Sequence, residues 1–362
     1  MSVRPATPFL LVDGLVVRRN LQRLAEYADE FELAVRPHTK THKSEILAKL
    51  QVEAGAYGLT VAKIGEAEVM SHVTDDLLLA YPVVDAEQAK RLAKLAAHNT
   101  VRVAVDSRFA IETLAAAARS ASTTMGVLID IDVGLHRTGV QTVGQSLVLA
   151  ELVDRTAGLR LDGLFCYPGH VWVMPEAQGP LLGEVSDLLY ETLGHWAEHG
   201  IEAAIVSGGS TPTCFQSHLV PELNEIRPGT YIFNDVNTWR GGFCRLEDCA
   251  ARVVATVVST AVPGQVVIDA GTKTLAADAC VALPQSGHGY LPSFPEARIV
   301  KLSEEHGQLD VRECRHAPQL GERVEIIPNH ICPCMNLQDR FWWKEEDGRI
   351  EPLPVDARGK VT

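Results

Sequence analysis

The sequence predicts an α/β protein in which a (β/α)8 barrel of the TIM type precedes a mostly β C-terminal domain. From about residue 32, short apolar or β-branched runs alternate with amphipathic stretches, and this alternation is typical of βα units that form a parallel sheet. After about residue 245 the helical stretches give way to short β-like runs separated by Gly and Pro.

Eight runs are candidate strands of the barrel, and eight strands are the number that closes one. The stretches 86–97 and 109–119 are rich in Ala, Leu and basic residues, so they are expected to be outer helices. We therefore predict the barrel over residues 14–245 and the β domain over residues 246–362, with a strand at 8–13 joining the β domain. The candidate barrel strands lie near residues 33–38, 57–61, 77–81, 101–105, 125–131, 161–166, 203–207 and 224–227.

The composition excludes several classes of function. Of the 362 residues, 46% are hydrophobic and 22% charged, which is enough for a large core, and a net charge of -13 argues against nucleic acid as a partner. No apolar run reaches the length of about 18 residues that suggests a membrane span, and the start lacks a signal-like pattern, so a cytoplasmic protein is expected. The eight cysteines are sparse and all lie from Cys166 onward, so most are expected to be reduced core thiols.

Polar residues and glycines gather where five of the candidate strands end. In a barrel these loops share one face, where barrel enzymes place their active sites. Each loop taken alone could be a simple turn, but five at the same end of the barrel predict a site. The loops cover residues 36–42, 132–139, 167–170, 207–213 and 227–231.

Two of these loops suggest chemistry. The run Ser207-Gly-Gly-Ser-Thr-Pro-Thr213 offers hydroxyls and backbone N–H groups without a lysine, which suits a bound phosphate but not a nucleotide P-loop. Lys40 follows the first strand and is flanked by Arg36, His38 and His42. A lysine held among cations loses its proton more easily, and the neutral amine can form an imine or abstract a proton. A solvated surface lysine stays open as an alternative.

A third candidate site lies near the C-terminus, in the run His330-Ile-Cys332-Pro-Cys334. If this segment is a strand, His330 and Cys332 point to one face about 7 Å apart. An imidazole and a thiolate suit zinc, and two or three ligands would leave positions open for water and substrate, as a catalytic metal requires. An alternating β run with core cysteines explains the same spacing.

A resemblance to a known family extends over nearly the whole chain. It rests on residues 7–13, 61–70 and 303–307, and on the two motifs Arg36-Pro-His-Thr-Lys-Thr-His-Lys43 and Pro328-Asn-His-Ile-Cys-Pro-Cys-Met-Asn336. In these segments the chain resembles the fold-type III, pyridoxal-phosphate (PLP)-dependent family of D-serine dehydratases and D-threonine aldolases. The resemblance implies an alanine-racemase-like barrel followed by a β domain, in a homodimer.

The resemblance also implies roles for individual residues. Lys40 would carry PLP as a Schiff base and act as a catalytic base, Arg137 would lie near the phenolic oxygen, and Tyr167 would lie near the ring and the substrate. His330 and Cys332 would hold Zn²⁺, with Mn²⁺ or Mg²⁺ as alternatives. The other residues implied to bind the cofactor are Tyr231 and, at the phosphate, Ser210, Thr211, Gly229 and Thr230. Either Tyr231 or Arg227 could face the ring nitrogen, and this choice stays open.

The metal motif bears on the reaction type. His-x-Cys, as at Cys332, resembles the dehydratases, whereas D-threonine aldolases more often have His-x-Asp. The resemblance therefore favours dehydration of a small D-3-hydroxy amino acid (D-serine, D-threonine or D-3-hydroxyaspartate) to a 2-keto acid and ammonia. Three alternatives remain: aldol cleavage of D-threonine or D-3-hydroxyaspartate to a glycine-type product and an aldehyde, racemisation, and non-catalytic PLP binding.

Overall fold

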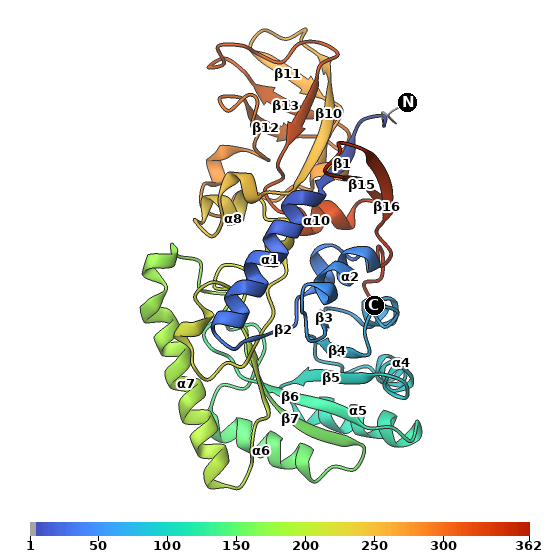
Figure 1. Cartoon of the computed structure of the whole chain (residues 1–362), viewed down its shortest axis with the longest axis vertical. Coiled ribbons are helices and arrows are strands. Elements are labelled where there is room, and N and C mark those ends of the chain that lie inside the picture. Colours follow the sequence, from blue (N-terminus) through green and yellow to red (C-terminus); the bar gives the residue numbers. More distant parts are fainter. Residues whose placement is uncertain (1–4) are drawn as a thin grey trace. The chain divides into compact units, whose positions relative to one another are not determined.

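The computed structural model describes residues 5–362 and divides into two compact units, which are described one at a time (Figure 1). The barrel unit comprises Arg23–Lys40, Glu45–Gly229 and Gly359–Thr362. The β unit comprises the residues up to Gln22, together with Thr41–Ser44 and Thr230–Arg358.

The barrel unit is built on one parallel sheet of eight strands in the order β2-β9-β8-β7-β6-β5-β4-β3. A parallel bridge between His38 and Thr60 joins the two ends of this order, just after β2 and within β3. The predicted α/β barrel is confirmed, and each candidate strand overlaps an observed one. The strands are β2 Ala34–Val35, β3 Leu59–Val61, β4 Asp76–Leu79, β5 Thr100–Val105, β6 Met125–Asp130, β7 Leu159–Phe165, β8 Ile205–Gly208 and β9 Glu225–Ile226.

Helices follow most of these strands, as the amphipathic stretches predict. The side chains of Asp85, Ser107 and Thr142 cap the N-termini of α4, α5 and α6 by accepting backbone N–H hydrogen bonds from the first turn. In α4 the buried residues are Ala or Leu, so its apolar face packs inward. The helices are α2 Glu45–Glu53, α3 Ile64–Met70, α4 Ala86–Ala96, α5 Arg108–Ser120, α6 Val143–Asp154 and α7 Gly179–Glu198. Helix α1, Gly14–Glu30, precedes β2, and its residues are divided between the two units at Gln22.

The inside of the barrel has an apolar part and a charged part. Leu78, Ala104, Leu128 and Phe165, one from each of β4 to β7, form a buried cluster. Arg36 is fully buried, and its guanidinium forms ion pairs with the carboxylates of Glu225, at 2.7 Å, and of Asp76. A buried charge is costly unless it is paired or hydrogen-bonded. Arg36 therefore takes part in a buried ion-pair network inside the barrel.

The β unit holds the second sheet, in the order β12-β13-β11-β10-β1-β15-β16, with β14 also paired to β10. Strand β1 runs antiparallel to β10 and parallel to β15, so it is an inner strand of this sheet. Its strands are β1 Phe9–Asp13, β10 Ala251–Ser259, β11 Gln265–Ile268, β12 Arg298–Leu302, β13 Gly307–Asp310, β14 Arg323–Ile326, β15 Arg340–Lys344 and β16 Ile350–Pro354. Its helices are α8 Val236–Arg240, α9 Thr272–Leu275 and α10 Ile331–Asn336.

Two further expectations concern the chain as a whole. All eight cysteines are free thiols, and five of them are buried, as expected for core thiols. Within residues 5–362, no helix has both the length and the apolar character needed to cross a membrane.

Candidate functional site

A cavity of about 520 Å³ opens within the barrel unit, where several polar loops meet. Its volume falls in the range of about 300–1,000 Å³ that is common for small-molecule and cofactor sites. Lys40, Arg137 and Tyr167 line it, so the structure brings together three residues that the sequence placed in separate loops. The remaining walls include Asp130 and Arg227.

Lys40 lies in a single 3-10 turn, η1 (Thr39–Thr41), just after the first barrel strand. The turn is held from both sides, because the Thr39 hydroxyl donates to the backbone oxygen of Thr60 at 3.1 Å and the His38 backbone N–H donates to the oxygen of Pro228 at 3.0 Å. These hydrogen bonds therefore hold the backbone of Lys40 in place at the edge of the cavity. Lys63 lines the same cavity, and its Nζ lies 3.6 Å from the centroid of the Tyr81 ring.

Arg137 is carried on a loop that Asp132 organises. The Oδ1 atom of Asp132 accepts hydrogen bonds from the backbone N–H groups of Gly134 and His136, each at 3.0 Å, and Oδ2 lies 2.7 Å from Nδ1 of His136. Burial would raise the pKa of Asp132, but these hydrogen bonds outweigh burial and lower it to about 2. The carboxylate is therefore charged at neutral pH, and it fixes the loop that presents Arg137 to the cavity.

Tyr167 follows β7 and packs against the apolar cluster of the barrel. The Arg137 guanidinium lies over its ring at 4.9 Å, so the two side chains form a cation–π pair in the wall of the cavity. Gly169 makes room for this ring, because a Cβ there would lie 2.3 Å from a Tyr167 ring carbon. A side chain at residue 169 would displace the tyrosine from its position.

Asp130 is a site residue that the sequence reasoning missed. It is the last residue of β6 and lines the cavity. Burial raises its pKa to about 6, with a further increase from Asp106, while a hydrogen bond with Thr138 and the charges of Arg227 and Arg137 act in the opposite direction. Its position at the carboxyl end of a barrel strand was the available signal, since polar residues there are typical of barrel active sites.

The raised pKa of Asp130 predicts a pH-dependent stability in the cofactor-free protein. The unfolded chain loses this proton near pH 4 and the folded protein only near pH 6, so the free energy of unfolding falls as pH rises through that window. Over the whole pH range, this shift changes the free energy of unfolding by about 3 kcal/mol. We expect the stability of Asp130→Asn, relative to the wild type, to rise by about 1 kcal/mol between pH 5 and pH 8 in urea unfolding. A relative stability that does not change with pH would show that this carboxyl titrates normally.

The loops after β8 and β9 form a buried, hydroxyl-rich turn. Ser210 and Thr213 are almost fully buried, with their hydroxyl oxygens 3.1 Å apart. The backbone N–H of Gly229 donates to Oγ1 of Thr211 at 3.3 Å, so the two loops meet. Small residues, hydroxyls and backbone N–H groups of this kind suit a phosphate group. The next residues, Thr230 and Tyr231, begin the turn η4 (Thr230–Ile232), which belongs to the β unit.

Arg227 has a structural position beside this turn. It is buried, its guanidinium lies 3.7 Å from the centroid of the Phe165 ring, and it donates to the backbone oxygen of Cys166 at 2.6 Å and to the Ser207 hydroxyl at 2.5 Å. Burial lowers the pKa of Arg227. Because it also lines the cavity, it presents a cation to whatever occupies that space.

The second set of predicted residues lies in the β unit. His330 and Cys332 are joined by a side-chain hydrogen bond. The Sγ atom of Cys332 lies 3.3 Å from Oγ1 of Thr41 and 3.6 Å from Oγ1 of Thr230. Thr41 directly follows Lys40 in the chain and Thr230 directly follows Gly229. Cys332 therefore contacts Thr41 and Thr230, the chain neighbours of Lys40 and Gly229.

The local backbone of this pair differs from the prediction. Residues Ile331–Asn336 form helix α10, and His330 is its N-cap, so the predicted strand and its 7 Å alternation are wrong. The carboxylate of Asp235 accepts the backbone N–H of Ile331, the first residue of this helix, at 3.0 Å. Cys334 points away from the pair, with Sγ 3.1 Å from the backbone oxygen of Thr274, and burial raises its pKa to about 12. Within this segment, the candidate metal ligands are therefore His330 and Cys332.

The electrostatics favour a charged pair. Burial opposes charge on both groups, but the hydrogen bond and attraction between them outweigh it, raising the pKa of His330 to about 9 and lowering the pKa of Cys332. The carboxylates of Asp235 and Asp278 add to the rise at His330, and the hydroxyls of Thr41 and Thr230 add to the fall at Cys332. A thiolate is the form of cysteine that binds a metal.

Asp278 and Asn329 support His330 and were missed by the sequence reasoning. Nδ1 of His330 lies 3.3 Å from Oδ1 of Asp278, and a carboxylate on one ring nitrogen leaves the other free for a metal. Asn329 holds the segment that carries Asp278, since its Nδ2 donates to the backbone oxygens of Asp278 and Gly287 at 2.9 and 2.7 Å. Asp278 is 52 residues away in sequence, so only the fold brings it to His330.

These residues fit PLP and a soft divalent metal. PLP requires an amine for its aldehyde, a cation beside its phenolic oxygen and donors for its phosphate, and the barrel unit supplies Lys40, Arg137 and the turn at Ser210. An imidazole, a thiolate and a carboxylate behind the imidazole match the donor preference of zinc.

Comparison with known proteins places the chain in a family. Residues 12–236 match the family "Alanine racemase, N-terminal domain", and residues 250–343 match "Putative serine dehydratase domain". The chain is 31% identical to D-threo-3-hydroxyaspartate dehydratase of Delftia sp., over 90% of each chain. It is 28% identical to D-threonine aldolase of Arthrobacter sp., over 98% of this chain and 93% of the relative.

A solved structure extends the likeness to the fold. The D-threonine aldolase of Filomicrobium marinum superimposes with a TM-score of 0.90 and 32% identity, over 99% of this chain and 97% of that chain. The resemblance inferred from the motifs is therefore confirmed. The chain belongs to the family of alanine-racemase-like lyases that includes the D-threonine aldolases and the D-threo-3-hydroxyaspartate dehydratases.

Proposed function

We propose that this protein is a PLP- and zinc-dependent lyase that dehydrates a small D-3-hydroxy amino acid to a 2-keto acid and ammonia. The observation that supports it most is the anchoring of Cys332 to Thr41 and Thr230, because these threonines are the chain neighbours of Lys40 and Gly229. Thr41, Thr230 and Cys332 all belong to the β unit, so these contacts hold within one compact unit. D-serine, D-threonine and D-3-hydroxyaspartate are the candidate substrates, and a cytoplasmic homodimer is the proposed form.

Each residue has a defined task in this reaction. Bound PLP would take up the electron pair that remains when the bond to the α-proton breaks. Lys40, as the free amine, accepts the α-proton, and its fixed turn holds Nζ at the cavity edge. Arg137 and Tyr167 line the wall beside it, and the turn at Ser210 and Thr211 binds the phosphate.

The metal pair acts on the leaving group. A zinc ion held by His330 and Cys332 would supply Lewis acidity to the β-hydroxyl, which is a poor leaving group by itself. In dehydration the α-proton goes to Lys40, the β-hydroxyl leaves and becomes water, and the resulting enamine takes up water to give the keto acid and ammonia. In aldol cleavage the hydroxyl proton is removed instead and the Cα–Cβ bond breaks.

Product analysis with D-threonine distinguishes the two reactions. We expect 2-oxobutyrate and ammonia as the dominant products, because the thiolate of Cys332 resembles the dehydratase pattern. L-threonine is the control and is expected to give neither product, because in the resembled fold the lysine lies on the face from which a D-amino acid loses its α-proton. Glycine and acetaldehyde as the main products would instead establish the aldolase, which the 28% identity to a D-threonine aldolase keeps as the second candidate.

A further inference from the structure

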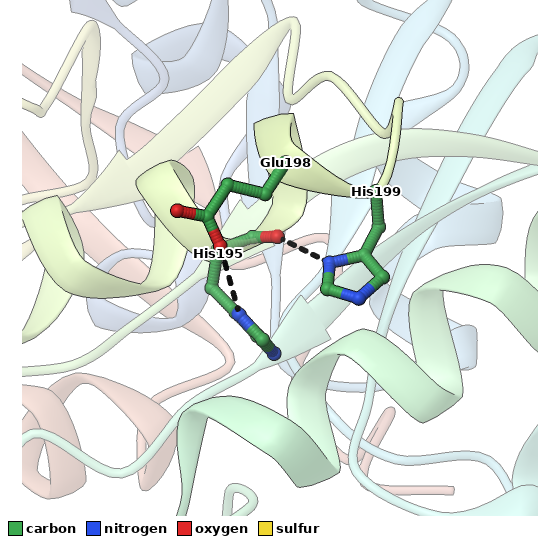
Figure 2. Close-up of side chains that lie close together, drawn as sticks. All are labelled: His195, Glu198 and His199. Atoms are coloured by element: carbon green, nitrogen blue, oxygen red, sulfur yellow. Dashed lines mark hydrogen bonds and ion pairs between the residues drawn. The ribbon is translucent and has the colours of Figure 1, made fainter.

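A cluster of three metal-type side chains lies at the C-terminal end of α7, in the barrel unit. The sequence His195-Trp-Ala-Glu198-His199 places both histidines and the glutamate on one face of the helix, because residues three and four apart are neighbours. Trp196 fixes which face this is: its side chain is fully buried and its Nε1 donates to the Ser146 hydroxyl at 3.0 Å. Glu198 and His199 are exposed and His195 is partly exposed. Figure 2 shows these three side chains close together.

The ligand atoms are already close to one another. One ligand atom from each of His195, Glu198 and His199 lies within 4.8 Å of the other two. Nδ1 of His195 is 3.7 Å from Oε2 of Glu198, and the two imidazole rings have centroids 4.7 Å apart. Ligands at about 2.1 Å from a tetrahedral ion lie about 3.4 Å apart, so only small rotations of exposed side chains are needed.

Two local features prepare these side chains for a cation. Nδ1 of His199 lies 2.9 Å from the backbone oxygen of His195, so Nδ1–H donates to it and Nε2 keeps its lone pair. Figure 2 shows this bond together with the approach of Glu198 to His195. The cluster also lies at the C-terminal end of a 20-residue helix, with His199 as its C-cap, and the helix dipole gives a negative potential there. Both features favour a positive ion here.

We propose that His195, Glu198 and His199 form a divalent transition-metal site, suited to Zn²⁺ and distinct from the pair His330 and Cys332. Two imidazoles and one carboxylate match zinc and exclude a preference for Mg²⁺ or Ca²⁺, which take oxygen ligands. Three protein ligands leave a fourth position for water. The two predicted sites lie in different compact units and share no residue.

The test is a titration of PLP-loaded, chelator-treated protein with ZnCl₂ in a calorimeter. In the background His330→Ala/Cys332→Ala we expect one zinc per chain to remain, bound by the α7 cluster. Adding His195→Ala/His199→Ala should weaken that binding by about 100-fold or more, since even outer partners of metal ligands contribute 10–100-fold. Zinc binding that is unchanged by the α7 substitutions, or absent from the background variant, would overturn the proposal.

Two controls separate ligation from other effects. His72→Ala removes an exposed histidine whose imidazole lies 3.0 Å from the Glu45 carboxylate, and it should leave zinc binding in the background variant unchanged. In the otherwise wild-type chain, His195→Ala/His199→Ala should keep full lyase activity and the wild-type melting temperature without metal. If zinc raises the melting temperature of the background variant and not of the combined variant, the ion binds the folded cluster.

Discussion

Replacing Lys40 with alanine is expected to abolish turnover of every D-3-hydroxy amino acid, by at least about 10⁴-fold in kcat, because one side chain both holds the cofactor and moves the α-proton. The turn η1 holds the backbone of Lys40 at the edge of the cavity. Borohydride reduction of the wild-type holoenzyme should fix the pyridoxyl group on Lys40, which peptide mapping by mass spectrometry would identify.

Lys63 is the matched control for this substitution. It lines the same cavity, but its Nζ is engaged with the Tyr81 ring at 3.6 Å. Lys63→Ala should keep the borohydride label on Lys40 and lose far less activity than Lys40→Ala. A label on Lys63 or Lys43, or substantial turnover by Lys40→Ala, would refute the assignment of Lys40.

His330→Ala and Cys332→Ala are expected to lose metal while keeping the yellow colour of bound PLP, because the two sites use different residues. Activity should fall by about 10²–10³-fold, since the β-hydroxyl then leaves without Lewis-acid help. Chelation of the wild type should have the same effect and zinc should reverse it. Metal content by mass spectrometry and absorbance near the PLP band would be measured on the same samples.

Cys334 provides the matched control for the metal pair. It is two residues from Cys332, but it is fully buried and lies against the backbone oxygen of Thr274. Cys334→Ala should therefore keep the metal and most of the activity. If Cys334→Ala loses metal and Cys332→Ala does not, the wrong cysteine has been assigned.

The identity of the residue at 332 also sets the metal preference. In Cys332→Asp a carboxylate replaces the thiolate, which favours the harder ions Mn²⁺ and Mg²⁺ over zinc. This variant is expected to raise glycine relative to 2-oxobutyrate from D-threonine, because the aldolases of the family more often carry Asp there. An unchanged product ratio with every metal would show that residue 332 does not select the reaction.

The sequence predicted the elements of the barrel well because their signals are local. Runs such as Leu77-Leu-Leu79 are buried on both faces of a parallel sheet, and such strands appear in the sequence as continuous apolar segments. Helices α4 and α5 carry both an amphipathic pattern and an N-cap residue, so their bounds agree with the predicted stretches within two residues.

The errors arose where a distant partner decides the outcome. The segment Ile331–Asn336 alternates like a strand, yet a carboxylate from Asp235 caps it as a helix. Arg36 appears in sequence as a free cation beside Lys40, yet it forms ion pairs with Glu225, on the neighbouring strand β9, and with Asp76. Neither partner can be read from local spacing, because hydrogen bonds and ion pairs depend on positions in space.

The sequence by itself determined the barrel with its β domain, the family, and the identity of the residues at the strand ends. These features depend on hydrophobic periodicity and short motifs, which are local properties of the sequence. Only the tertiary structure decided that Asp130 lines the Lys40 cavity with a raised pKa and that Asp278 and Asn329 support His330. It also decided that Trp196 is buried and leaves His195 and His199 together on the surface. Burial, charge pairing and the distances between ligand atoms are properties of the folded chain, because they depend on contacts between residues that are far apart in sequence.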